Sequence, residues 1–349
     1  MTRPIAERPA RDEGEAFNRL ALVALAVYLA VLLYLMIVAG LWPTFDLVIV
    51  GIAVLALILG RGRLFLRDWI PFLLIFLAWE AMRGLADNFG AGVHSDGVIA
   101  IERAISFGIV PTVELQRLLY VPGQVSFLDV ATSLLYAGHF IFPLGIAFVF
   151  WLRDRALYYR FAVTLLAMAL AAFVVYLLLP VAPPRFAYQH GEALPVTDII
   201  GQTIVNLRLQ IGADWVYQNL NPNDNAAFPS LHAAFPTLAF FFVRSRYPRA
   251  AWLVALYGAA VWFAIVYTGH HYVVDILGGV AFAAVAYLAV DRGGMLDRLL
   301  SVLMDLRLPG RQPDPAAQLA PMAARSETGR EVAASPHAAD REGAARRRS

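Results

Sequence analysis

The stretch YYRFAVTLLAMALAAFVVYLLLPV, residues 158–181, carries a single charged residue in 24 positions. About 20 apolar residues in a helix cross a hydrocarbon core about 30 Å thick, so the stretch predicts a transmembrane helix. A strand of this composition would leave its backbone unsatisfied in lipid, and the chain lacks the alternating pattern of a membrane barrel. We therefore expect an all-α fold in a membrane.

Seven further apolar runs accompany this stretch. They lie near residues 17–41, 44–60, 69–86, 128–152, 229–245, 250–268 and 271–290. Each reaches the lower limit of about 17 residues for a spanning helix. Together the eight runs predict a polytopic membrane helical bundle of about eight transmembrane helices.

The composition agrees with a membrane protein and excludes several other classes. Hydrophobic residues make up 60% of the chain and charged residues only 15%, which is far from the balance of a soluble domain. All 28 basic residues are Arg and the net charge is only +2, so nothing indicates nucleic acid as a partner. The absence of Cys excludes disulfides, thiolate metal sites and Cys nucleophiles.

The two ends of the chain differ from its middle. Residues 1–16 are charged, and residues 309–349 are rich in Ala, Pro, Arg and Glu, so neither end buries enough apolar surface to order itself. We expect a disordered N-terminal tail over 1–16, a transmembrane domain over 17–300 and a disordered C-terminal tail over 309–349.

Arg residues concentrate in every second connection between the predicted spans. The positive-inside rule places these connections and both termini in the cytoplasm of a multi-pass protein of the cell membrane. The loops near 87–127 and 182–228, and the turn at Gly269, then face the extracytoplasmic side. The Arg residues that predict this orientation are Arg3, Arg8, Arg11, Arg19, Arg61, Arg63, Arg67, Arg153, Arg155, Arg160, Arg244, Arg246, Arg249, Arg292 and Arg298.

The motif HHYVVD, residues 270–275, falls on that outer side. His271 and Asp275 are four positions apart, so on a helix the carboxylate can accept a hydrogen bond from one imidazole nitrogen. That bond fixes the tautomer and raises the basicity of the other nitrogen. An ionisable pair at the head of a membrane span is costly unless it faces a polar cavity, which makes it a functional candidate.

A second motif, FPSLH at residues 228–232, begins another predicted span on the same side. Pro229 suits the first helical position, and a helix N-terminus attracts anions such as phosphate. Ser230 adds a hydroxyl, and His232, one turn into the helix, can reach the same anion as a proton donor.

Arg185 completes the set of candidate residues. It follows two prolines just after the run 158–181, where a guanidinium can bind two phosphate oxygens. An Arg, a helix N-terminus with a Ser, and two His with an Asp suit phosphoryl transfer through a phosphohistidine.

These residues resemble the motifs of the type 2 phosphatidic-acid phosphatase superfamily, usually written KxxxxxxRP, PSGH and SRxxxxxHxxxD. PSLH at 229–232 is similar to the second motif with Leu for Gly, and His271 to Asp275 is similar to the end of the third. Arg185 in PPR is a looser counterpart of the first motif, because no Lys precedes it.

The variants FPSLHAA and YTGHHYVVDILGG resemble more closely the branch of the inositol phosphorylceramide synthases, which move a phosphorylated head group between lipids. The resemblance is specific over about 180–280, and it implies a six-helix catalytic core within the bundle. Ile265 stands where the third motif has Arg, and His270 is a candidate for the missing phosphate ligand.

The resemblance also implies roles. His271 resembles the nucleophile, Asp275 its orienting partner, His232 the general acid, and Arg185 and Ser230 the phosphate ligands. The implied substrate is a phospholipid or another lipid phosphoester, with no cofactor and no metal. With an alcohol or a lipid as acceptor, the protein is a transferase. The resemblance favours this activity, with inositol phosphate as one candidate for the head group. Water as acceptor makes it a lipid phosphate or polyprenyl-diphosphate phosphatase.

Other interpretations stay open beside this one. A zinc site formed by His270, His271 and Asp275 is disfavoured, because adjacent residues on a helix diverge by about 100°. His139 in YAGHFIFPL is a candidate for substrate contact or for a polar contact between helices. A transporter or scaffold that retains the motif is the alternative from another functional class.

The outer loop that contains residues 97–123 has its own pattern. Apolar residues recur there at helical spacing with a few charges between them, which predicts a helix lying in the membrane interface. Arg83, Glu102 and Arg103 are interpreted as interfacial anchors.

Overall fold

The structure, a computed structural model, describes residues 45–83, 95–139, 141–190, 194–207 and 225–294, with isolated positions between 23 and 34 and residue 93. The predicted run 17–41, apart from those positions, and both predicted tails lie outside the described residues. Every element named below belongs to one compact unit, Met1–Leu296.

Helices dominate the described residues, which form no strand beyond one isolated pairing of Val181 with Ala226. The all-α prediction is therefore confirmed for this part of the chain. The helices are α2 (Phe45–Ile58), α3 (Gly62–Arg83), α4 (Ser95–Ile105), α5 (Pro111–Leu119), α6 (Phe127–Ala137), α7 (Ile141–Arg153), α8 (Arg155–Leu178), η2 (Pro184–His190), α9 (Ile199–Asn206), α11 (Leu231–Arg246), α12 (Ala251–Tyr267), α13 (Val273–Ala286) and η3 (Tyr287–Arg292).

The predicted runs that fall on described residues correspond to helices, with two differences. Helix α3 begins at Gly62, seven residues before the predicted run 69–86. The run 128–152 is divided into α6 and α7, which are bent by 54° at the break between them. Within the described residues, α8 and the segment Val273–Arg292 are long and apolar enough to cross a membrane, and the bent pair adds a third if it is one span. The number of eight spans therefore stays a prediction.

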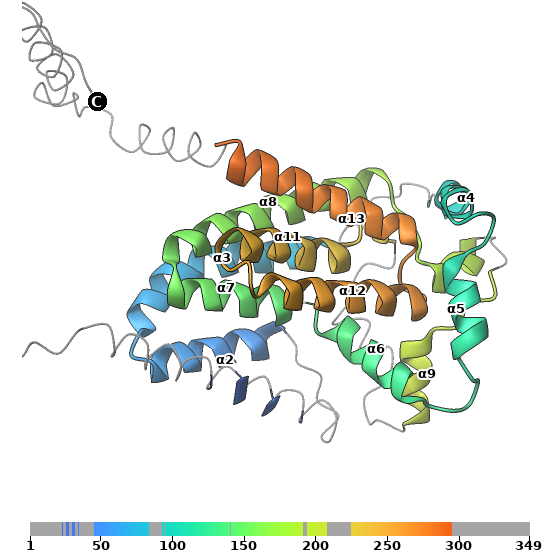
Figure 1. The fold of residues 1–349 in the computed structure, drawn as a ribbon, viewed down its shortest axis with the longest axis horizontal. Coiled ribbons are helices and arrows are strands. Elements are labelled where there is room, and N and C mark those ends of the chain that lie inside the picture. Colours follow the sequence, from blue (N-terminus) through green and yellow to red (C-terminus); the bar gives the residue numbers. More distant parts are fainter. Residues whose placement is uncertain are drawn as a thin grey trace, which may run out of the picture. The chain divides into compact units, whose positions relative to one another are not determined.

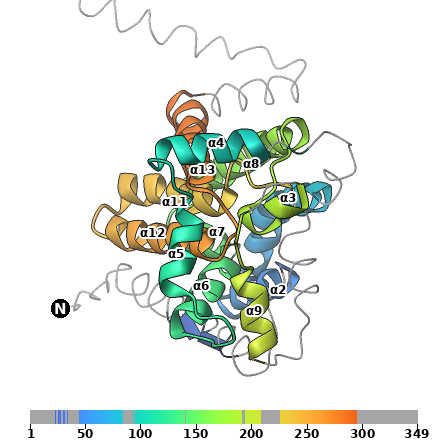
Figure 2. The same cartoon turned by 90° about the vertical axis from the view of Figure 1, so that its right-hand side faces the viewer.

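The helices that carry the motifs pack against one another. Helix α11 contacts both α12 and α13, and α8 contacts α3, α7, α11 and α13. Figures 1 and 2 show α4, α5, α6 and α9 gathered at one end of these helices. Among them, α5 and α6 contact α12, and α4 contacts α13.

An aromatic core joins α3 to α7 and α8. Trp69 is fully buried and stacks on Phe65 and on Tyr158, with ring centroids 5.3 Å and 5.2 Å apart. Trp151 meets Phe65 edge-on at 5.9 Å. Such ring pairs add about 0.5–1.5 kcal/mol each beyond burial. Close packing of this kind, more than transfer out of water, associates helices that lie in lipid.

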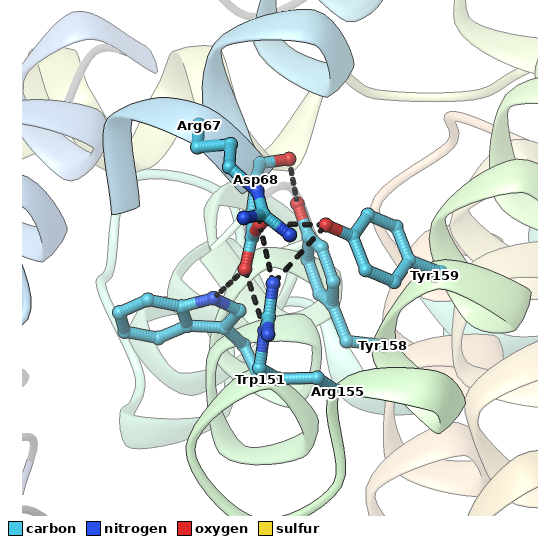
Figure 3. Close-up of polar contacts among 6 residues, drawn as sticks. All are labelled: Arg67, Asp68, Trp151, Arg155, Tyr158 and Tyr159. Carbon is cyan, nitrogen blue, oxygen red and sulfur yellow. Dashed lines mark hydrogen bonds and ion pairs between the residues drawn. The ribbon is translucent and has the colours of Figure 1, made fainter. Parts of the chain in front are cut away.

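A buried carboxylate lies beside this core (Figure 3). Asp68 of α3 is 2% exposed and accepts hydrogen bonds from Trp151 Nε1, from Arg155 Nε and Nη2 and from the Tyr159 hydroxyl, at 2.6–2.9 Å. Its backbone oxygen accepts from the Tyr158 hydroxyl at 3.0 Å. A buried charge is tolerated when its oxygens are satisfied in this way. The cluster fastens α3 to α7 and α8.

The Arg-bearing helix ends meet on the same side as this cluster. Besides the contact of Arg155 with Asp68, Arg160 pairs with Asp291 at 2.7 Å, and Arg246 lies 3.6 Å from Asp154. These contacts join the start of α8, the end of α11 and the end of η3. The motif residues lie at the opposite ends of the same helices, so the predicted separation of Arg-rich connections from the motifs agrees with the fold.

Candidate active site

His271 lies between a carboxylate and a second imidazole. Its Nδ1 is 3.3 Å from Oδ2 of Asp275, and its Nε2 is 3.2 Å from Nδ1 of His232. The rings of His271 and His232 have centroids 5.1 Å apart, although the residues are 39 positions apart in the chain. All three side chains are buried. The two motifs thus meet, as expected from the sequence. His232 lies in α11, but His271 precedes α13 instead of sharing that helix with Asp275, which is a difference from the prediction.

The turn between α12 and α13 places His271. Gly269 adopts φ +82°, a left-handed conformation that other residues rarely adopt, and it follows the last turn of α12. The backbone N–H of His270 donates to Ile265 O at 3.0 Å, and that of Gly269 donates to Val266 O at 3.2 Å. This is the Schellman pattern of helix termination. It ends α12 sharply and presents His270 and His271 ahead of α13.

The carboxylate of Asp275 contacts both His271 and the start of α13. As the third residue of α13 it accepts the backbone N–H of Tyr272 at 2.8 Å through Oδ2, the oxygen that also faces His271. A carboxylate in the first helical turn also benefits from the helix dipole. The first turn of α13 thus holds the carboxylate in one orientation toward the imidazole.

The start of α11 differs slightly from the prediction. The helix begins at Leu231 with Ser230 as its cap, so Pro229 precedes the helix instead of occupying its first position. The Ser230 hydroxyl accepts the backbone N–H of Ala233 at 3.3 Å, and the Ser230 N–H donates to Asp275 O at 3.0 Å. The second bond joins the two motifs through their backbones.

Glycine allows this close approach of α11 and α13. A Cβ on Gly279 would clash with the carbonyl oxygen of Ser230 and would lie 3.2 Å from the Cβ of Ala233. A larger residue at Gly279 would therefore push His232 away from His271.

The backbone of Arg185 is bonded to the turn between α12 and α13. Its N–H donates to the oxygen of Gly269 at 3.0 Å, which ties η2 to the turn that carries His271. The segment before it is tied to the start of the second motif, because Val181 O accepts from Ala227 N at 3.0 Å. The side chain of Arg185 is buried, with its guanidinium carbon 3.8 Å from the ring centroid of Phe186.

His139 and Tyr136 lie against His232, and Tyr136 links it to His270. The ring of His139 lies 3.7 Å from that of His232, and Tyr136 stacks on His232 at 4.5 Å. Tyr136 also contacts His270, at 4.3 Å. His139 is buried at the break between α6 and α7, and its Nδ1 lies 3.3 Å from the backbone oxygen of Tyr136. The structure thus brings both His139 and His270 to the site, together with Tyr136, which the sequence did not single out.

The environment of His270 favours its neutral form. Burial above all, and then electrostatic interactions with Arg185 and His271, lower the pKa of His270 well below its ordinary value. Its Nδ1 lies 3.2 Å from the backbone oxygen of Thr268 and 3.1 Å from the Thr268 hydroxyl. A neutral imidazole can donate a hydrogen bond to an anion, so this environment favours a hydrogen bond from His270 over a positive charge.

Ile265 itself belongs to the apolar core. Its side chain is fully buried with Tyr136, Ala233 and Ile276 among its cluster. Only its backbone serves the site, by accepting the N–H groups of His270 and His271.

Glu102 is not an interfacial anchor, contrary to the prediction. Its carboxylate is fully buried and accepts two backbone N–H groups of α13. Burial raises the pKa of Glu102 by more than these hydrogen bonds lower it. Arg103, one position on, is exposed as expected. Charge alone could not distinguish the two residues, although the helical periodicity of the segment places Glu102 on the same face as Val98 and Ile99.

An imidazole held in this way has defined chemistry. With Nδ1–H donated to a carboxylate, Nε2 carries a lone pair and can act as a base or a nucleophile. A neighbouring imidazole can then supply or accept a proton. Within the described residues, no group of three or more His, Asp or Glu side chains is arranged to hold a metal ion.

Comparison with known proteins agrees with this chemistry. A sequence model of the PAP2 superfamily matches residues 96–289, from α4 to η3. The chain is similar to the phosphoinositol dihydroceramide synthase of Bacteroides thetaiotaomicron, with 27% identity over 242 residues that cover 65% of this chain and 76% of that protein. It is also similar to the inositol phosphorylceramide synthase of Candida albicans, with 26% identity over 173 residues that cover 46% of this chain and 36% of that protein. No solved structure matches the chain significantly.

Proposed function

The chain belongs to the PAP2 superfamily, and on this basis we propose that it is a membrane enzyme that transfers a phosphorylated head group from one lipid to another through His271. The pairing of His271 with Asp275 on one side and His232 on the other is the observation that carries the proposal. The names of the two relatives favour inositol phosphate as the head group and a ceramide as the acceptor.

The first half-reaction forms a phosphohistidine. Nε2 of His271 attacks the phosphorus of the donor lipid, and the bond from phosphorus to the diacylglycerol oxygen breaks. His232 gives its proton to that leaving oxygen, so diacylglycerol departs neutral. Asp275 keeps the proton on Nδ1 of His271 and stabilises the positive ring that results.

The second half-reaction reverses these roles. His232 removes the proton from the acceptor hydroxyl, and the acceptor oxygen attacks the phosphorus. The bond from phosphorus to Nε2 breaks, which restores His271. If water took the place of the acceptor, the enzyme would be a lipid phosphatase.

Substrate binding must change one contact. A separation of 3.2 Å between Nε2 of His271 and Nδ1 of His232 leaves no space for a phosphorus atom between them. We propose that the phosphate group replaces this hydrogen bond and that His232 then bonds a phosphate or leaving-group oxygen. Arg185 supplies positive charge, while His270 and the Ser230 hydroxyl supply neutral hydrogen bonds.

We propose that the domain spans residues 17–300 and that the active site opens on the extracytoplasmic side. The opposite placement of the Arg-bearing helix ends and the motif ends supports this orientation, with both termini in the cytoplasm. Helix α8 has 24 residues and is about 36 Å long, enough to cross a hydrocarbon core.

The test uses an inositol phospholipid with a labelled head group, supplied to the purified protein with and without ceramide. We expect label to enter the ceramide product, and His271→Ala to abolish both this product and an acid-labile labelled enzyme. Release of free label at the same rate with or without ceramide would instead indicate a phosphatase. Full activity of His271→Ala would reject the phosphohistidine route, and a transporter that retained the motif would keep its function in that variant.

A further inference from the structure

The turn that carries His270 and His271 is held from one side by α4. Oε1 and Oε2 of Glu102 accept the backbone N–H groups of Val273 and Val274 at 3.0 Å and 2.9 Å. These are the first two residues of α13, and Asp275 is the third. Such N–H groups have no partner within their own helix, so a carboxylate that binds both of them fixes the position of the helix start.

The other side of the turn is held by α5. Nε2 of Gln116 donates to the backbone oxygen of Tyr267 at 2.8 Å, at the end of α12, and to that of Thr197 at 2.9 Å. Oε1 of Gln116 accepts the N–H of Thr197 at 2.8 Å. Gln116 is 5% exposed, and all of these partners are backbone groups.

The turn also fits tightly into this surrounding. A Cβ on Gly269 would lie 2.8 Å from Val196 and 3.5 Å from Nε2 of Gln116. Tyr272, at the far end of the turn, is fully buried in a cluster with Val98 and Ile99 of α4. The outer helices therefore enclose the turn and bond it at both ends.

We propose that Glu102 and Gln116 are positioning residues, which hold residues 268–272 from both sides and so keep His271 in line with Asp275 and His232. This inference rests on the proposed role of His271. Its physical basis is that nucleophilic attack tolerates little displacement, and a shift of about 1 Å at the reacting atom costs up to about a hundredfold in rate.

The two side chains differ in what their replacement removes. Glu102→Gln keeps the size of the side chain, but its amide nitrogen cannot accept the second N–H group of α13. Gln116→Met keeps the approximate length of the side chain and removes all three hydrogen bonds. Neither residue is expected to touch the substrate, so substrate binding should change less than the chemical step.

The experiment measures kcat and KM for head-group transfer by the full chain in detergent, expressed per folded protein, at temperatures well below thermal unfolding. Glu114→Gln and Gln124→Met are the matched controls, since Gln124 is exposed and Glu114 pairs with Arg117 at the surface of α5. We expect kcat to fall about ten- to a hundredfold in Glu102→Gln and Gln116→Met, with KM within about twofold. The controls should match the natural protein.

The outcomes separate this inference from the proposed function. If His271→Ala is inactive but both positioning variants keep the kcat of their controls, the inference is wrong and the proposed function stands. If His271→Ala is active, the proposed role of His271 is wrong, and the inference that rests on it is wrong as well. A fall in activity that only follows the loss of folded protein would indicate a structural role and would also overturn the inference. If Glu102→Gln does not fold, Gln116→Met decides the matter alone.

Discussion

His232 of α11 and His271, in the turn before α13, are 39 positions apart in the sequence, yet Nε2 of His271 lies 3.2 Å from Nδ1 of His232. In the proposed mechanism, His232 serves the leaving oxygen and not the attack itself. We expect His232→Asn to lose about a hundred- to ten-thousandfold in kcat with natural lipids. With a nitrophenyl phosphoester, whose leaving group departs without a proton, much of the loss should disappear. An equal loss with both substrates would contradict the role of His232 as an acid.

Asp275→Asn should separate the charge of this residue from its role in folding. Oδ2 of Asp275 both accepts the N–H of Tyr272 and faces Nδ1 of His271, so an Asn oxygen in its place can keep both contacts but carries no negative charge. The positive ring of the phosphohistidine then loses its counter-charge, so we expect kcat to fall about a hundredfold, with thermal unfolding little changed. The exposed Asp96→Asn is the control. Full activity in Asp275→Asn would argue against a role of this charge in the reaction.

The contact of Gly279 with Ser230 predicts a strict size limit. Gly279→Ala adds a Cβ that clashes with the Ser230 oxygen and pushes α13 from α11. We expect lower activity and a lower unfolding temperature, because overpacking of this kind costs about 1–3 kcal/mol. Gly145→Ala, in α7, has open space for its Cβ and should leave both quantities unchanged or slightly raised. If the two variants have the same activity and the same unfolding temperature, the close approach of α11 and α13 is not required for either property.

The Asp68 cluster should matter for stability without touching the site. Asp68→Ala leaves Trp151, Arg155 and Tyr159 without their shared acceptor. We expect a loss of about 2–4 kcal/mol in the free energy of unfolding, measured as a lower unfolding temperature in detergent. The KM of the protein that remains folded should be unchanged. An unfolding temperature equal to that of the natural protein would show that the cluster does not contribute to the stability of the fold.

Acid should weaken the fold through His270. Its pKa is lowered by burial first and then by electrostatic interactions with Arg185 and His271, so the unfolded chain binds a proton more readily than the folded one below the ordinary pKa of about 6.5. This part of the stability is complete above that pH and declines as the pH falls below it. We therefore expect the unfolding temperature to drop between pH 7.5 and pH 5.5, and to drop less in His270→Gln. The same drop in both proteins would exclude His270 as its source.

The sequence predicted the helices and the proximity of the motifs for physical reasons that can be named. A stretch of 24 residues with a single charge, such as 158–181, has few alternatives to a helix in lipid. The sequence predicted the contact of His271 with Asp275 from a shared helix, but His271 lies two residues before α13. The turn after α12 and the cap of α13 by Asp275 bring the two side chains together instead. Hydropathy did not predict the break at Gly138 and His139, because the run 128–152 stays apolar enough across it to indicate one continuous span.

Other features depend on tertiary contacts that a pattern does not contain. A charged residue such as Glu102 is usually found at the surface. Its two hydrogen bonds depend on the packing of α13 against α4, which brings two N–H groups to its carboxylate. Gln116 likewise bonds backbone groups 81 and 151 positions away. The neutral state of His270 follows from its burial beside Arg185, which the distance between them along the chain does not reveal.

Ion pairs join the charged ends of α8, α11 and η3, and the motif residues lie at the other end of this helix bundle. In the proposed orientation, the height of the two imidazoles above the lipid would be set by helix length relative to bilayer thickness. In vesicles of short-chain lipids the bilayer is thinner, and the site would lie farther from the head groups. In vesicles of long-chain lipids the site would lie deeper than the head groups. Turnover in vesicles should accordingly pass through an optimum as the acyl chains lengthen.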